Sequence, residues 1–289
     1  MYRIWEEDEK SDGNGTECYV RIQSDKSLES YLSKNGSVPI PPYLHRASEK
    51  SDKERYNNVY AESAGSVAAP TAGLHFTDEL LEKLGTNSIS QVCLHVGAGT
   101  FKPVLAKDAR DHNMHAEIFS VPVKEIRSIV NALKDGKDLT AVGTTSSRTL
   151  ESLFWCGVKK LRGLDASTGN YLKLEQFEWV PLGVVANSNS ISRVAALEIL
   201  IDQLDEDDII HGQTSLMITP PIYQFRVVDH LVTNFHAPDS TLMLLVSAFI
   251  KDDGVKLRRI YEDAQENGFR LLSYGDSCML SPAKISNLK

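Results

Sequence analysis

Apolar residues recur at helical spacing in several parts of the chain, and capping residues mark where each part begins or ends. In the clearest example, residues 123–133 carry apolar side chains three and four positions apart, with Pro122 at the first turn and Gly136 as the stop. Further helices are predicted at 27–36, 77–85, 146–154, 193–204, after Ser240 and at 257–268. The pattern therefore predicts helices spread over most of the chain.

Strand-like segments alternate with these helices. They lie at 17–22, 88–96, 139–145, 172–180, 214–218, 224–235 and 270–280, and the last includes a turn at 274–276. Residues 139–145 (LTAVGTT) read as a buried strand that leads through small residues into the helix at 146–154. Repeated units of strand, turn and helix predict an α/β fold whose ligand cleft lies at the carboxyl ends of the strands.

Composition narrows the class of protein. The 289 residues can bury one large core or two modest ones. The longest apolar run, 242–250, has about half the length needed to cross a bilayer, and the polar first ten residues do not resemble a leader. The four cysteines are far apart, which argues against a zinc ribbon or a disulfide framework and for a reducing compartment. We therefore expect a cytoplasmic enzyme.

The charge of the chain does not indicate a nucleic-acid-binding protein. The formal net charge is −8, whereas contacts with phosphates come from lysine and arginine. A locally basic face remains compatible with this total, so an RNA substrate stays open.

Histidines are concentrated in residues 65–117. Four of the eight histidines lie there, at His75, His95, His112 and His115. Imidazole titrates near neutral pH, so this clustering favours proton transfer or ligand recognition. We expect the active centre in this window.

The motif DHNMHAE places Asp111, His112, His115 and Glu117 close together. The HxxH spacing would suit a metal on a helix, but the motif lacks the HExxH pattern. A histidine–carboxylate pair for proton transfer is the preferred interpretation, and a plain polar strand edge is the alternative. We expect no metal.

Two small-residue turns are candidate ligand sites. In HVGAGTF, Gly97 and Gly99 would let the backbone approach a ligand closely, although such glycines also form ordinary tight turns. In TTSSR, residues 144–147 and Arg148 gather hydroxyls and a guanidinium at a helix start. Capping needs one hydroxyl, so the surplus favours binding of a carboxylate or phosphate.

The segment TNFHAPDS carries a further candidate. It places Asn234 and His236 at the end of a strand, before a helix capped by Asp239 or Ser240. With the charged residues of 226–229 nearby, these side chains would form a second wall of the cleft. The alternative is that His236 is a hydrogen-bonded structural residue.

Taken in order, the motifs resemble those of one known family. They are PPYLHR, ERYNNVYA, GSVAAPTAGLHFT, LHVGAGTFKPV, HNMHAE, AVGTTSSRTLES, VDHLVTNFHAPDSTLMLLVSAF and SYGDSCML, from residue 39 to residue 280. Together they closely resemble the S-adenosylmethionine:tRNA ribosyltransferase-isomerases of queuosine biosynthesis, the QueA family. The resemblance implies transfer of the ribosyl moiety of S-adenosylmethionine to 7-aminomethyl-7-deazaguanine at the wobble position of a tRNA. The implied products are epoxyqueuosine-tRNA, adenine and methionine.

The resemblance also suggests roles for the candidate residues. A sulfonium acidifies the neighbouring C5′ hydrogens, so the reaction needs a base, and an acid must assist the departing adenine. The acid–base candidates, with the roles undivided, are His95, His115, Glu117 and His236. The candidates for binding S-adenosylmethionine are Gly97, Gly99, Thr100, Thr144, Thr145, Ser146, Arg148 and Asn234. The resemblance implies a monomer that uses no metal.

The resemblance implies an α/β large domain with a small β-barrel domain near the N-terminus. Family members normally carry a longer N-terminal segment, so we expect 1–37 to be a remnant of the barrel and the proline-rich connector to begin the catalytic domain, 38–289. Two other functions stay open. One is a methyltransferase built on the GAG loop, which would need an acidic residue after the next strand; none is well placed. The other is a truncated paralogue that binds tRNA or S-adenosylmethionine without turnover.

Overall fold

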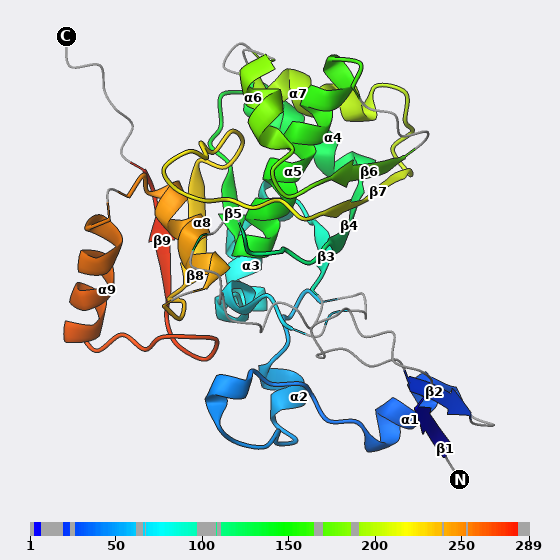
Figure 1. Cartoon of the computed structure of the whole chain (residues 1–289), viewed down its shortest axis with the longest axis vertical. Coiled ribbons are helices and arrows are strands. Elements are labelled where there is room, and N and C mark those ends of the chain that lie inside the picture. Colours follow the sequence, from blue (N-terminus) through cyan, green and yellow to red (C-terminus); the bar gives the residue numbers. More distant parts are fainter. Residues whose placement is uncertain are drawn as a thin grey trace.

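The computed structural model describes residues 3–6, 20–23, 27–61, 66, 68–96, 108, 111–164, 170–185, 191–238, 240–252 and 254–282. Over this part the chain is an α/β structure, as the sequence predicts. Figure 1 shows one long helix, α5 (Thr144–Leu161), between two small sheets.

The larger sheet has four strands in the order β3-β4-β7-β6. Their bounds are Cys93–His95, Glu117–Pro122, Ile209–Thr214 and Tyr171–Leu174. The first three pair antiparallel and β6 pairs parallel with β7. The core side chains of β4 and β7 include Phe119 and Ile210, both within 1% of full burial.

The second sheet has three strands in the order β5-β8-β9. Their bounds are Thr140–Val142, His230–Asn234 and Ser277–Leu280. β5 and β8 are parallel, and β9 is antiparallel to β8. The carboxyl ends of β5 and β8 therefore share one edge, where the sequence predicts a ligand cleft.

Helices cover both sheets and connect them. Their bounds are Leu28–Asn35 (α1), Asp52–Arg55 (α2), Asp78–Leu84 (α3), Val123–Lys134 (α4), Trp179–Val185 (α6), Arg193–Ile201 (α7), Thr241–Phe249 (α8) and Lys256–Glu266 (α9). Short 3-10 helices lie at Pro42–Leu44 (η1), Thr71–His75 (η2) and Thr86–Ser88 (η3). The helix α5 packs against strands of both sheets, against α6 and most extensively against α7. No helix among the described residues has the length and apolar character to span a membrane.

The capping signals in the sequence were confirmed where the structure describes them. Ser27 caps α1, and its hydroxyl accepts from the Ser30 amide, while Gly36 follows the helix. Thr77 caps α3 in the same way, and Gly85 ends the helix with a φ of 78°. Local side-chain-to-backbone bonds of this kind need no tertiary contact, so they can be read from sequence.

The extent of α5 was predicted wrongly. The helix begins at Thr144 rather than residue 146, and it continues through Gly157 to Leu161. Gly157 does not end the helix because its missing side chain leaves room for the backbone of α7. A Cβ atom at this position would lie 1.8 Å from the carbonyl oxygen of Ala196.

Several predicted strands are shorter than expected. Only Cys93–His95 of 88–96, His230–Asn234 of 224–235 and Ser277–Leu280 of 270–280 are strands. Residues 215–218 are buried but lie beyond the end of β7, and α6 begins at Trp179 within the predicted strand 172–180. The apolar character of these segments suggested strands, but a short apolar run does not distinguish a strand from another buried segment.

Strands β1 (Arg3–Glu6) and β2 (Val20–Gln23) pair antiparallel in a separate two-stranded sheet. They lie in the region predicted as a remnant of a small barrel. The division into 1–37 and 38–289 stays a prediction.

Candidate functional site

The first turn of α5 stands at the shared edge of β5 and β8. The chain leaves β5 at Val142 and turns at Gly143, whose φ of 92° favours glycine. Thr144 is buried, while Thr145 and Ser146 are half-buried. Gly143 supplies no side-chain cap, so the first amides of the helix point toward this edge without a capping oxygen. The predicted hydroxyl cluster therefore lies at a helix start beside the strand ends.

Arg148, one turn further along α5, forms a buried ion pair with Glu117 of β4. Its Nη1 lies 2.8 Å from Glu117 Oε2, and both side chains are at least 93% buried. The contact is an ion pair rather than a directed hydrogen bond, since Oε2 accepts none. The sequence had grouped Glu117 with His115 and Arg148 with the hydroxyls. The structure instead joins the two candidates to each other, so Arg148 is already engaged by a carboxylate.

The HNMH segment lies against Gln176. The Gln176 side chain donates to the His112 carbonyl oxygen at 2.5 Å and accepts from the Met114 amide at 2.9 Å. Burial and the nearby charge of His115 lower the pKa of His112, and His115 itself is exposed. The segment is not helical, so the HxxH spacing does not have the geometry of a helical metal site. Among the described residues no cluster of three or more histidine, cysteine or acidic residues could hold a metal.

His95 ends β3, next to the glycine-rich turn. It is half-buried, and its Nε2 lies 3.8 Å from the sulfur of Cys93. The following residue, Val96, donates its amide to Ser66 Oγ at 3.1 Å. The predicted ligand residues Gly97, Gly99 and Thr100, like the alternative cap Asp239, lie outside the described residues.

His236 occupies a buried position after β8. Its Nε2 hydrogen-bonds to Thr233 Oγ1 at 2.7 Å, and its backbone amide donates to the Tyr261 hydroxyl at 2.9 Å. Burial lowers the pKa of His236 to about 4, so the ring is neutral at pH 7. His236 follows β8 of the three-stranded sheet, whereas His95 and Glu117 lie on strands of the four-stranded sheet.

A cluster that sequence reasoning did not assemble lies at the end of β8. Asn234 is 1% exposed, and its side-chain Nδ2 donates to the Leu272 carbonyl oxygen at 3.2 Å and lies 3.4 Å from Nε2 of His75. His75 is the last residue of η2 and is exposed. The charge of His75 also contributes to lowering the pKa of Asp276, although the amide and guanidinium of Arg270 contribute more.

A network of hydrogen bonds joins the segment 42–60 to the turn that precedes β9. Asp52 accepts two bonds of 2.7 Å from the Arg46 guanidinium and one of 2.8 Å from the Tyr274 hydroxyl. The Arg46 guanidinium, together with the Glu49 amide, holds the pKa of Asp52 well below its usual range. A second bond joins Tyr43 to Ser273. The early segment 42–60 is thus fixed to the turn that carries Asp276.

Two glycines were the available sequence signals for this cluster. A Cβ atom at Gly73 would lie 1.9 Å from the Tyr60 hydroxyl, and one at Gly275 would lie 2.3 Å from the Leu271 carbonyl oxygen. Both glycines stand inside motifs quoted above, PTAGLH and SYGD. Their presence indicates close packing of the backbone but does not say which segments meet.

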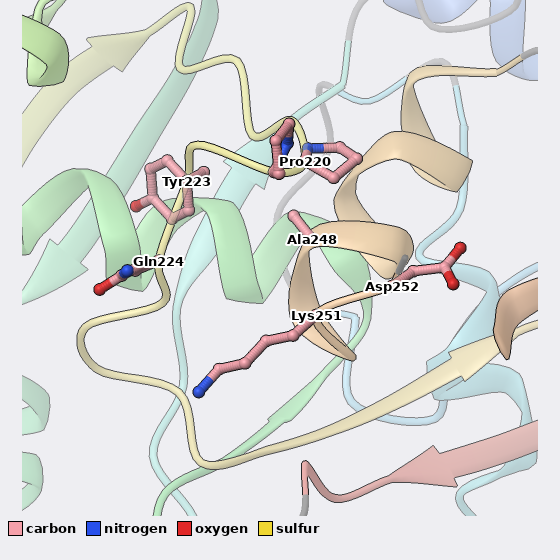
Figure 2. A pocket seen from close by; sticks show the side chains of 7 residues that line it. Pro220, Tyr223, Gln224, Ala248, Lys251 and Asp252 are labelled. Atoms are coloured by element: carbon pink, nitrogen blue, oxygen red, sulfur yellow. The ribbon is translucent and has the colours of Figure 1, made fainter. Parts of the chain in front are cut away.

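A separate surface pocket of about 240 Å³ lies beside α8. Its lining residues are Pro220, Pro221, Tyr223, Gln224, Ala248, Lys251 and Asp252. Figure 2 shows Pro220 near Ala248, while Lys251 and Asp252 point in different directions. None of the predicted site residues lines this pocket.

Comparison with known proteins identifies the family. The family model described as queuosine biosynthesis protein matches residues 2–280. Similar curated proteins include the S-adenosylmethionine:tRNA ribosyltransferase-isomerase of Sulfurihydrogenibium sp. (strain YO3AOP1), which is 39% identical over 264 residues, covering 90% of this chain and 62% of that relative. The protein of the same name from Francisella tularensis subsp. novicida (strain U112) is 36% identical over 271 residues, covering 93% and 65%.

Among solved structures, the chain is similar to the S-adenosylmethionine tRNA ribosyltransferase of Thermotoga maritima. The two are 30% identical, with a TM-score of 0.43, over 72% of this chain and 51% of that chain. This chain spans between three fifths and two thirds of the length of the curated relatives, 62% and 65%. The match of the family model over nearly all of the chain is sufficient to conclude that it belongs to the family of queuosine biosynthesis proteins.

Proposed function

We propose that the protein transfers and isomerises the ribosyl moiety of S-adenosylmethionine onto 7-aminomethyl-7-deazaguanine in tRNA. The products are epoxyqueuosine-tRNA, adenine and methionine. The observation that carries the proposal is membership of the family, together with the names of the two relatives. The proposed enzyme is a cytoplasmic monomer that acts on the wobble position and uses S-adenosylmethionine as substrate, without a metal.

The reaction needs proton transfer at two places on the donor. A base removes a proton from C5′, which the adjacent sulfonium makes acidic. An acid supplies a proton to adenine as the bond from C1′ to the base breaks. The 7-aminomethyl nitrogen loses a proton and forms the new carbon–nitrogen bond to the ribosyl moiety. The electron pair left at C5′ forms the carbon–carbon bond that closes the new ring. An oxygen of the ribosyl moiety then displaces sulfur from C5′ to close the epoxide, so the electrons of the C5′–sulfur bond leave with methionine. The candidates for these two roles are His95, His115, Glu117 and His236.

Glu117 has the strongest support among these candidates. Arg148 holds its carboxylate in place at 2.8 Å, and Arg148 lies one helical turn from Thr144. One turn of an α-helix rises about 5.4 Å, so the backbone of Arg148 lies about one turn from the amides that begin α5. His236 is neutral but its Nε2 bonds to Thr233, which favours a supporting role.

The proposed binding residues lie at the strand ends and in the glycine-rich turn. Thr144, Thr145, Ser146 and Asn234 stand at the shared edge of β5 and β8, where they bind the donor. Gly97, Gly99 and Thr100 approach the nucleoside. Arg148 acts through Glu117 instead of contacting an anionic group.

Product analysis tests the proposal. The protein is incubated with S-adenosylmethionine and tRNA that carries 7-aminomethyl-7-deazaguanine, and the products are separated by chromatography. Adenine and epoxyqueuosine-tRNA are expected. S-adenosylhomocysteine would indicate a methyltransferase, and the absence of both products would indicate binding without turnover; either result contradicts the proposal. The variants Glu117→Ala and His115→Ala then test the segment 111–117. If both variants release adenine at a rate near that of the parent, this segment takes no part in the chemistry.

A further inference from the structure

At the end of β8, the side chain of Asn234 has one polar atom without a partner. The residue is 1% exposed, and Oδ1 accepts no hydrogen bond from any residue that the structure describes. The orientation of the amide is fixed because Nδ2 donates to the Leu272 carbonyl oxygen at 3.2 Å, and a carbonyl oxygen can only accept. Oδ1 therefore faces away from Leu272 and requires a donor.

The strand that carries Asn234 pairs with the strand that leads into α5. The parallel pairing matches Val142 with Val232, and the Gly143 amide continues it by donating to the Val232 carbonyl oxygen at 2.8 Å. Thr144 follows Gly143 directly and begins α5, and Asn234 ends β8 two residues after Val232. The helix that begins there has 18 residues and no side-chain cap, so its first amides and its dipole favour a negative group.

Two further features belong to the same place. The Ser147 hydroxyl, in the first turn of α5, is fully buried and likewise makes no hydrogen bond to a described residue. The helix η2 lies next to the start of α5, because a Cβ atom at Gly143 would lie 4.0 Å from that of Ala72. The exposed His75 of η2 stands 3.4 Å from Asn234 Nδ2.

We propose that this site binds the α-amino acid end of S-adenosylmethionine. The carboxylate accepts from the first amides of α5, and the α-ammonium donates to Asn234 Oδ1. A phosphodiester of tRNA would satisfy the amides but carries no proton to donate to Oδ1, so it fits the site less well. The carboxylate of Asp276, near His75, also favours the ammonium over a second negative charge. This inference deepens the proposed function, since it takes S-adenosylmethionine as the donor.

Calorimetric binding with three probes tests the assignment. S-adenosylmethionine and S-adenosylhomocysteine both carry the amino acid, whereas 5′-methylthioadenosine lacks it. Asn234→Ala should weaken binding of the first two by roughly ten- to a hundred-fold, the range for a hydrogen bond to a charged group, and leave the third unchanged. An equal loss for all three probes, or no loss for any, would overturn the inference.

A second variant keeps the test valid if Asn234→Ala fails to fold. Thr144→Pro removes one amide at the first helical position, where proline is well tolerated, and should show the same selective loss. Asn267→Ala, an exposed residue at the end of α9, is the matched control and should bind all three probes as the parent does. Selective loss in Asn267→Ala as well would overturn the assignment.

The binding test and the product analysis have independent outcomes, so a failure of one proposal can be distinguished from a failure of the other. A parent protein that prefers the two amino-acid-bearing probes but releases no adenine supports the site and contradicts the proposed reaction. A parent that releases adenine, while Asn234→Ala and Thr144→Pro keep its ligand preference, supports the reaction and overturns the site.

Discussion

Glu117 of β4 and Arg148 of α5 form an ion pair of 2.8 Å in the interior of the protein. The pair links the four-stranded sheet to the helix whose first turn lies at the edge of the other sheet. It therefore joins the candidate proton-transfer residue to the candidate donor site.

Removing one member of this pair should be costly. Arg148→Met leaves a buried carboxylate without its counter-charge, and we expect the free energy of unfolding to fall by about 3–5 kcal/mol, measured by urea denaturation. The double variant Glu117→Leu/Arg148→Met should recover much of this stability but not adenine release. A matched control is Lys134→Met, which breaks the exposed pair with Glu198 and should change stability by about 0–1 kcal/mol. Equal losses in Arg148→Met and the control would contradict the prediction.

The buried His236 should make stability depend on pH. Its pKa falls from 6.5 in the unfolded chain to about 4 in the folded protein because burial disfavours the charged ring. Folding is then unaffected by this group above pH 6.5, loses stability as the pH falls from 6.5 toward 4, and levels off below. The loss is about 3 kcal/mol, from about 1.4 kcal/mol for each pH unit.

Denaturation curves between pH 4 and pH 7 check this dependence. His236→Gln should flatten the profile in that window, although it lowers stability at pH 7. His211→Gln, at an exposed position on β7, should keep the slope of the parent. An unchanged slope in His236→Gln would show that another group titrates there.

Gly157 should tolerate no side chain. A Cβ atom would lie 1.8 Å from the Ala196 carbonyl oxygen, so Gly157→Ala must separate α5 from α7. We expect a loss of at least about 1–3 kcal/mol, as for other overpacked sites, measured by thermal or urea unfolding. Lys160→Ala, an exposed change on the same helix, should have little effect. Equal stability of both variants would mean that the helices do not pack this closely.

Tyr274→Phe tests the attachment of segment 42–60. Burial raises the pKa of Tyr274 to about 12, so the phenol keeps its proton and donates to Asp52 at 2.8 Å in neutral solution. Without this bond, amide exchange in 49–60 and 272–276 should become faster. The control Tyr171→Phe removes an exposed hydroxyl that donates to Gln213 at 3.2 Å. Faster exchange in the Tyr171→Phe control, or in neither variant, would contradict the role of the Asp52 bond.

Features decided by neighbouring residues could be predicted from the sequence. Helix starts at Ser27, Thr77 and Ser240 were confirmed because each hydroxyl accepts from an amide three residues along the chain. The alternation of strands and helices likewise predicted an α/β fold with polar residues at the strand ends. The placement of the hydroxyls of α5 and of Asn234 at one edge of the sheet follows from the parallel pairing of β5 and β8.

Features decided by distant residues could not be predicted. Glu117 and Arg148 are 31 positions apart, and only the packing of α5 against the larger sheet brings them together. The sequence also did not predict which histidines are exposed. His115 is exposed and His236 is buried, although both have polar neighbours in the sequence. The turn at Tyr274 gave no sign that Asp52 is its partner.

The bond from Tyr274 to Asp52 spans 222 residues, and that from Tyr43 to Ser273 spans 230. At roughly 5–20 residues per second on the ribosome, the first partner of each pair emerges on the order of 10–45 s before the second. The early segment therefore waits without these two anchors, which can form only after residues 273 and 274 have emerged. A nascent chain that stops short of residue 273 can form neither bond.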